Sequence, residues 1–144
     1  MRIDGVLRAK GTDVISVVPT ATLLEAAGLL RKHRIGALLV IGPDEQVAGI
    51  ISERDIVSTL AERGTAALET SVDQAMSADV VVCSPNDTVE QLMAIMTERR
   101  FRHLPVVDDG HLVGIVSIGD VVKRRLAEVS DEANALHDYI TLGR

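Results

Sequence analysis

The nine residues GIVSIGDVV, at positions 114–122, have a near copy in GIISERDIV at positions 49–57. Each phrase places a Ser three residues after a Gly and an Asp three residues after that Ser. A phrase of this kind written twice in 144 residues indicates an internal repeat, and a repeat constrains the whole fold.

The sequence before each phrase matches as well. DVISVVP (13–19) returns as DVVVCSP (79–85), 66 positions later, and ALLVI (37–41) returns as HLPVV (103–107). The turn that follows HLPVV, which contains DDG, is one residue shorter than the turn that follows ALLVI. The spacing between matching residues therefore falls from 66 to 65 positions at the two Gly–Ser phrases. These short aliphatic runs predict buried strands.

Apolar residues at helical spacing follow the first strand of each copy. Leu23, Ala26, Ala27 and Leu30 predict one helix, which Thr22 and Glu25 are spaced to cap. The segment 88–100 repeats that pattern, and residues 53–63 predict the helix after the first Gly–Ser phrase. The chain therefore reads as two β-α-β-β-α repeats.

We predict an α+β fold in which the two repeats are related by a pseudo-twofold axis, with helical extensions at both ends. A half of about 60 residues is marginal on its own, so the two sheets are expected to pack together and leave a cleft. The expected boundaries are an N-terminal helix at 1–11, a first repeat at 12–66, a connector at 67–77, a second repeat at 78–130 and a C-terminal helical extension at 131–144.

The amino-acid composition argues against several classes of function. The net charge of −6 and the single Phe, single Tyr and absent Trp argue against nucleic-acid binding, which needs basic residues and stacking platforms. No apolar run approaches the roughly 20 residues of a membrane span, and the N-terminus lacks a signal-peptide core. One Cys excludes an internal disulfide, and we expect a cytoplasmic protein.

The Ser-x-x-Asp pairs, Ser52 with Asp55 and Ser117 with Asp120, have two explanations. Each is spaced as a capping box, in which Ser and Asp satisfy free amides at the start of a helix. Each also suits a nucleotide, because an Asp accepts hydrogen bonds from the ribose diol and a helix N-terminus attracts phosphate. Gly49 and Gly114, inside aliphatic strands, mark a close approach by another group.

Together with RFRHLPVVDDGHLVGIVSIGDVVKRR (100–125), the repeated phrase resembles the tandem CBS-domain pair, or Bateman module, of stand-alone bacterial-type proteins. The resemblance covers about residues 12–127. It implies adenosyl ligands in clefts between the repeats, each site taking its Ser and Asp from one repeat and its adenine pocket from the other. One site would join Ser117, Gly119 and Asp120 to Val18, Ile35, Gly36 and Ala37; the other would join Ser52, Arg54 and Asp55 to Ser84, Phe101, Arg102 and His103.

The two predicted sites differ in charge. Arg102 and His103, with Arg54, suit a phosphate, unless they lie on a solvated rim and pair with acids. Gly36 and Ala37 leave room for a bulkier or less charged group at the other site. AMP or NAD(H) is the favoured ligand, and ATP, ADP and S-adenosylmethionine are alternatives.

We therefore expect a regulatory sensor that passes its ligand state to a partner protein that the sequence does not identify. The alternative is a ligand-free structural or dimerisation module whose Ser-x-x-Asp pairs are only helix caps. We expect no enzyme, because no nucleophile motif is present, although an enzyme that uses Asp55 or Asp120 as a general base on a nucleotide is a third possibility. The His residues and the single Cys show no metal-ligand spacing, and Cys83 is expected in the core. The resemblance favours a homodimer of two such pairs.

Overall fold

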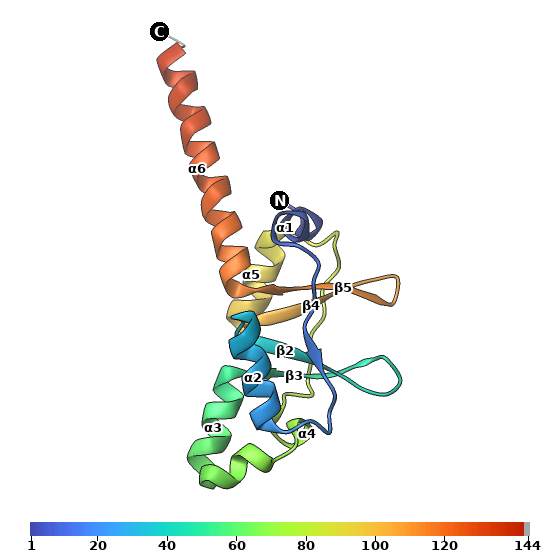
Figure 1. The fold of residues 1–144 in the computed structure, drawn as a ribbon. Helices are drawn as coiled ribbons and strands as arrows, with labels where there is room; N and C mark the ends of the chain where they lie inside the picture. The colour runs from blue at the N-terminus through green and yellow to red at the C-terminus, as the bar shows by residue number, and fades with distance from the viewer. Residues whose placement is uncertain (143–144) are drawn as a thin grey trace. The chain divides into compact units, whose positions relative to one another are not determined.

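The computed structural model describes residues 1–142, and the chain forms two compact units (Figure 1). The first-repeat unit comprises Asp13–Val81. The second-repeat unit comprises Met1–Thr12 together with the chain from Val82 onward. Each unit thus contains one repeat and the segment that precedes the other repeat in the sequence.

The first-repeat unit has a three-stranded sheet in the order β1-β2-β3, with β1 parallel to β2 and β2 antiparallel to β3. Leu23, Leu38 and Ile51 are fully buried at its core. Its elements are β1 (Ser16–Val17), α2 (Leu23–His33), β2 (Ala37–Ile41), β3 (Val47–Ser52), α3 (Glu53–Arg63), the 3₁₀ helix η1 (Gly64–Glu69) and α4 (Val72–Ala75).

The second-repeat unit has a two-stranded antiparallel sheet, β4 with β5. Leu92, Leu104 and Val116 are fully buried there. Its elements are α1 (Ile3–Lys10), α5 (Val89–Arg99), β4 (His103–Asp108), β5 (His111–Ser117) and α6 (Ile118–Leu142). The α+β class and the two-repeat fold are confirmed.

Helix caps explain where the predicted helices begin. The Thr22 hydroxyl accepts a hydrogen bond from Glu25 N at 3.2 Å, as its spacing predicted. In the second repeat Thr88 and Gln91 make both bonds of a capping box. Gly11 ends α1 with a positive φ of 104°, a conformation that glycine adopts without strain.

The strand predicted within residues 79–85 is wrong. In the second-repeat unit an isolated parallel bridge between Cys83 and Val106 stands in its place. In the first repeat Leu39 N donates to Ile15 O at 3.4 Å, but the residue matching Leu39 is Pro105, which has no N–H to donate. The remaining bonds run from Cys83 N to Pro105 O and from Val107 N to Cys83 O, too few for a strand.

The segments that precede the repeats are exchanged between them. Leu7 of α1 packs on β5, where a Cβ added at Gly114 would lie 2.7 Å from Leu7 Cδ2. After α4, Ser77 pairs with Ile50 of β3 through two hydrogen bonds of 2.9 Å. A Cβ at Gly49 would lie 2.6 Å from the Ser77 carbonyl oxygen. The chain's own backbone and side chains thus make the close approach that both glycines indicated.

Helix α6 runs without a break from Ile118 to Leu142, so residue 130 lies inside a helix. Beyond its first turns the side chains are almost all exposed. Over residues 1–142, no helix is both long and apolar enough to cross a membrane.

Candidate functional site

The Asp120 half-site, which we define as Ser117, Gly119 and Asp120, lies where β5 passes into α6. Ser117 N donates to Asp120 Oδ2 at 2.9 Å, and Asp120 N donates to the Ser117 hydroxyl at 3.2 Å. These reciprocal bonds form the predicted helix cap. Gly119 is exposed, and an added Cβ would meet only the Ser117 hydroxyl, at an ordinary 3.6 Å.

Lys10, at the end of α1, is a residue of this half-site that the sequence did not reveal. Its Nζ donates to Asp120 Oδ2 at 2.5 Å and to the Ile115 carbonyl oxygen at 2.8 Å. Partial burial pushes the pKa of Asp120 upward, but the bonds from Lys10 and Ser117 outweigh it and hold that pKa below its ordinary value. Asp120 is therefore ionised and paired with a cation.

The Asp55 half-site, Ser52, Arg54 and Asp55, has the same cap at the start of α3. Ser52 N and the Ser52 hydroxyl both donate to Asp55 Oδ2 at 2.9 Å, and Asp55 N donates back to the hydroxyl at 3.3 Å. Arg54 is exposed beside it. Both capping boxes are thus formed by the chain alone.

The segments exchanged between the repeats are related in sequence and differ in charge at one matched position. RIDGVLRAK (2–10) aligns without a gap with SVDQAMSAD (71–79), so that Ile3 matches Val72 and Asp4 matches Asp73. Their backbones bond alike, since Asp4 N donates to Pro85 O and Asp73 N donates to Pro19 O, both at 3.0 Å. In this alignment the position of Lys10 is held by Asp79, so an acid replaces the cation. The likeness of IDGVL to VDQAM is the signal that sequence reasoning overlooked.

Some residues predicted for the adenine pockets lie beside the Ser-x-x-Asp motif of their own repeat. Ala37 pairs with Ser52 across β2 and β3, and Gly36 O accepts a hydrogen bond from Glu53 N at 3.0 Å. His103 pairs likewise with Ser117, and Arg102 O accepts from Ile118 N at 2.8 Å. The grouping of these residues across the two repeats stays a prediction.

The remaining predicted pocket residues are at loops. Val18 follows β1 and is 57% exposed, whereas Ile35, between α2 and β2, is half-buried. Ser84 lies in a turn, where its N–H donates to Asp87 Oδ2 at 2.8 Å. Phe101 is half-buried, with the Arg99 guanidinium 5.5 Å from its ring centroid.

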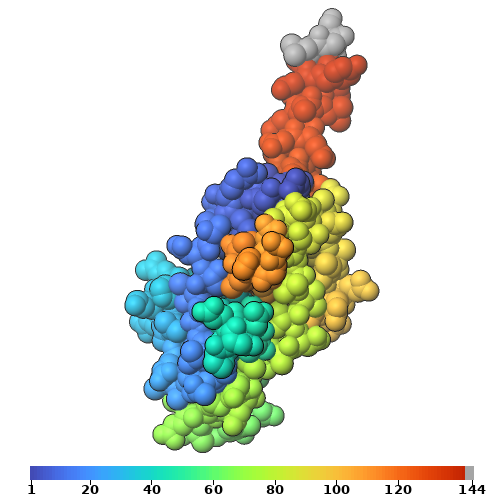
Figure 2. Space-filling model, turned by 90° about the vertical axis from the view of Figure 1, so that its right-hand side faces the viewer, coloured from blue at the N-terminus to red at the C-terminus, as the bar shows by residue number. Residues whose placement is uncertain are grey.

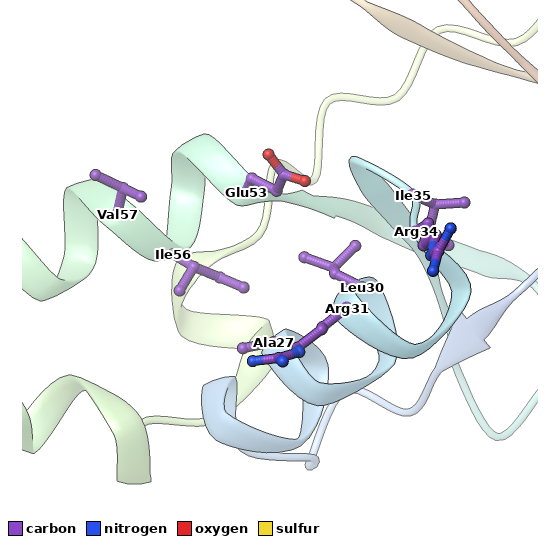
Figure 3. Close-up of a pocket in the computed structure, with 8 residues that line it drawn as sticks. All are labelled: Ala27, Leu30, Arg31, Arg34, Ile35, Glu53, Ile56 and Val57. Atoms are coloured by element: carbon purple, nitrogen blue, oxygen red, sulfur yellow. The ribbon is translucent and has the colours of Figure 1, made fainter.

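An open groove of about 610 Å³ runs between α2 and α3 in the first-repeat unit (Figure 3). Leu30 and Ile56 lie between the two helices, and Arg31, Arg34 and Glu53 add charge. Neither Ser52 nor Asp55 lines this groove, but Glu53, which lies between them in the sequence, and Ile35, which was predicted for an adenine pocket, both do. The groove therefore borders the Asp55 half-site at Glu53.

Cys83 is buried, as expected from its apolar surroundings. Burial, with a smaller contribution from the charge of Asp87, raises the pKa of its thiol to about 12. Among residues 1–142 no three His, Cys, Asp or Glu side chains gather as a metal site would require.

Comparison with known proteins finds the same domain twice in this chain. The family model described as the CBS domain matches residues 10–62 and again residues 72–127. The chain belongs to the CBS-domain family. This CBS-domain chain is 34% identical over 149 residues to the mitochondrial CBS domain-containing protein CBSX3 of Arabidopsis thaliana, covering 98% of the chain and 72% of that relative. The crystal structure of the CBS-domain protein ATU1752 from Agrobacterium tumefaciens is 50% identical, with a TM-score of 0.83 over 86% of this chain and 92% of that one.

Two solved relatives of this CBS-domain chain hold adenosyl compounds. The CBS domain protein PAE2072 from Pyrobaculum aerophilum is complexed with AMP; it is 28% identical, with a TM-score of 0.74 over 83% of this chain and 89% of that one. The CBS domain pair of protein MJ0100 is in complex with 5′-methylthioadenosine and S-adenosyl-L-methionine; it is 25% identical, with a TM-score of 0.75 over 85% of this chain and 98% of that one. These two solved CBS-domain relatives therefore bind small adenine-containing molecules.

Proposed function

We propose that this CBS pair is a cytoplasmic sensor that binds an adenosyl ligand and passes its ligand state to a partner protein. AMP or NAD(H) is the favoured ligand, and ATP, ADP or S-adenosylmethionine is the alternative. The observation that carries the proposal is the pair of capped Ser-x-x-Asp motifs, in a family whose members include the AMP-bound protein from P. aerophilum. A regulatory rather than catalytic role is part of this proposal.

Gly119 adds support at the Asp120 half-site. Glycine is a poorer helix residue than alanine, by roughly 0.5–1 kcal/mol in the middle of a helix. Packing within the chain does not require it, since an added Cβ would meet only an ordinary contact. A glycine at this position is explained if a ligand lies against the start of α6, because a side chain there would occupy the same space.

A ligand-free module is the competing function, and one observation favours it. The Ser52–Asp55 and Ser117–Asp120 bonds already satisfy the amides at the starts of α3 and α6, so the motifs serve the fold without a ligand. Self-association is common to both proposals. The groove between α2 and α3, with exposed Leu24, Val57 and Leu60, offers an apolar surface for a homodimer.

Calorimetry and thermal unfolding with AMP, NAD, ATP and S-adenosylmethionine separate the two functions. A ligand at 100 times its Kd should add about 2.7 kcal/mol to the free energy of unfolding. The variants Asp55→Asn and Asp120→Asn keep an oxygen for the cap but weaken the acceptor for a ribose diol. Each variant should lose affinity for AMP at one site. If none of the four compounds changes the melting temperature of the parent protein, the sensor proposal is wrong and the ligand-free module is the remaining function.

Comparing AMP with adenosine tests whether Arg102 binds the phosphate of the ligand. Arg102→Ala should weaken AMP binding at the Asp55 half-site and leave adenosine binding there unchanged, because only AMP carries the phosphate. Equal losses for both compounds would show that Arg102 acts through the fold.

A further inference from the structure

Helix α6 carries a continuous apolar stripe that the proposed function does not use. Six apolar residues follow one another at alternating spacings of four and three positions. This is the a/d pattern of a heptad repeat, and it extends over roughly 27 Å of helix at 1.5 Å per residue. The residues of this stripe are Val122, Leu126, Val129, Ala133, Leu136 and Ile140.

The stripe is exposed although it is apolar. Leu126 is 65% exposed, Leu136 61% and Ile140 50%. In Figure 2 the C-terminal turns of α6, in red, project beyond α1 of the same unit. A row of large apolar side chains left in water marks a surface for another helix.

The helix packs on its own unit through a different face. Val121 is fully buried, and Arg125 forms an ion pair of 3.2 Å with Glu90 of α5. At 100° per residue, the stripe lies roughly a quarter-turn around the helix from that packed face. The contacts that hold α6 in its unit therefore leave the stripe uncovered.

We propose that the stripe of α6 pairs with the same stripe of a second copy of this chain as a parallel two-stranded coiled coil. A carboxylate and an imidazole beside the stripe, which can form a hydrogen bond, select the occupant and its direction. Glu132 holds a g position and His137 the next e position, so a parallel copy sets Glu132 beside the partner's His137. An antiparallel copy with the same core layers brings Glu132 close to the partner's Glu132, which is repulsive.

The short length of the stripe limits the strength of the pairing. Fewer than three full heptads form a short coiled coil, so pairing of α6 rests on the proposed homodimer, which would hold the two helices at a high local concentration. One unbroken helix joins the Asp120 half-site to this interface, because α6 begins beside Ser117 and carries the stripe to Ile140. The proposal itself does not depend on ligand binding.

Disulfide cross-linking of the full chain tests the pairing. Ala133→Cys places a thiol at an a position, where two parallel helices bring identical residues within disulfide reach. Asp131→Cys is the matched control, because its f position faces away from the partner. The buried native thiol of Cys83 leaves the new cysteine as the reactive one.

We expect Ala133→Cys to form covalent dimers at least ten times faster than Asp131→Cys under mild oxidation. The added changes Leu126→Lys and Leu136→Lys should abolish that difference while circular dichroism still shows a folded chain. Equal rates at 131 and 133, or a stripe variant that cross-links as before, would overturn the proposal. If Val129→Cys chains cross-link with Ala133→Cys chains, but Ala133→Cys chains do not cross-link with each other, the parallel direction is wrong. If Ala133→Cys stays monomeric and forms no cross-link, the proposed pairing is wrong and the stripe binds a different protein.

Discussion

Lys10 Nζ lies 2.5 Å from Asp120 Oδ2, although the two residues are 110 positions apart in the sequence. The bond fastens the last turn of α1 to the first turn of α6, at the helix cap predicted to bind ribose. Both side chains are partly exposed, at 32% and 26%. Their interaction is therefore screened by solvent, and its contribution to stability is modest.

Lys10→Met should lower the free energy of unfolding by about 1 kcal/mol at pH 7, because it removes a partly buried ion pair and keeps the aliphatic stem. Urea denaturation measures the change. Arg8→Met is the matched control, since Arg8 on the same helix is 80% exposed and its ion pair with Asp4 is long, at 4.0 Å. The control should unfold like the parent.

The same variant has a predictable pH dependence. The folded-state pKa of Asp120 is lowered, so its bond stabilises the fold above the unfolded pKa of about 3.9 and is lost as the pH falls through the lower folded value. The difference between parent and Lys10→Met should be constant from pH 5 to 7 and should shrink below about pH 4. A difference that persists undiminished at pH 2 would show that Lys10 acts through packing rather than charge.

Gly49→Ala should destabilise the chain more than Gly114→Ala. At Gly49 the new Cβ meets the Ser77 carbonyl oxygen at 2.6 Å, and a paired backbone cannot move aside. At Gly114 it meets the end of the Leu7 side chain at 2.7 Å, which can rotate. Overpacking of this kind costs about 1–3 kcal/mol, and we expect Gly49→Ala at the upper end and Gly114→Ala at the lower.

A double-mutant cycle checks the cause at Gly114. If the clash with Leu7 is responsible, Leu7→Ala and Gly114→Ala together should cost less than the sum of the two single changes. Strict additivity would place the strain elsewhere in β5. Equal losses for the two glycine variants would contradict the distinction between backbone and side-chain neighbours.

What the sequence predicted depended on residues close together in the chain. The helices and both Ser-x-x-Asp caps follow from apolar periodicity and from bonds that span three positions, such as Asp120 N to the Ser117 hydroxyl. The failed strand at 79–85 depended on Pro105, more than 20 positions away, because the pairing partner decides whether a strand forms.

The exchange of α1 and α4 between the repeats was beyond local patterns as well. An amphipathic helix shows that it packs, but not on which sheet, so α1 gave no indication that Lys10 would reach Asp120. Gly49 and Gly114 did signal a close approach, yet a glycine does not reveal whether a ligand or the chain itself makes it.

Cys83 should be inert in the folded protein. Its thiol has a pKa of about 12, chiefly from burial, so the thiolate that reacts with disulfide reagents is rare at pH 8. A chromogenic disulfide reagent should label native protein at the rate of unfolding and label protein in urea within seconds to minutes. Rapid stoichiometric labelling of the native chain at pH 8 would contradict the burial of this side chain.

Lys10 also changes the ligand preference expected at the Asp120 half-site. The sequence favoured a less charged group there, but the structure adds an ammonium beside Asp120 that can attract a phosphate near the ribose. If an adenosyl ligand binds this half-site, Lys10→Met should weaken AMP binding there severalfold and leave adenosine binding unchanged or stronger. Titration calorimetry in an Asp55→Asn background isolates this site, and Lys10→Arg should retain the AMP preference. Adenosine and AMP weakened equally by Lys10→Met would mean that Lys10 only positions Asp120, and the less charged ligand would again be favoured.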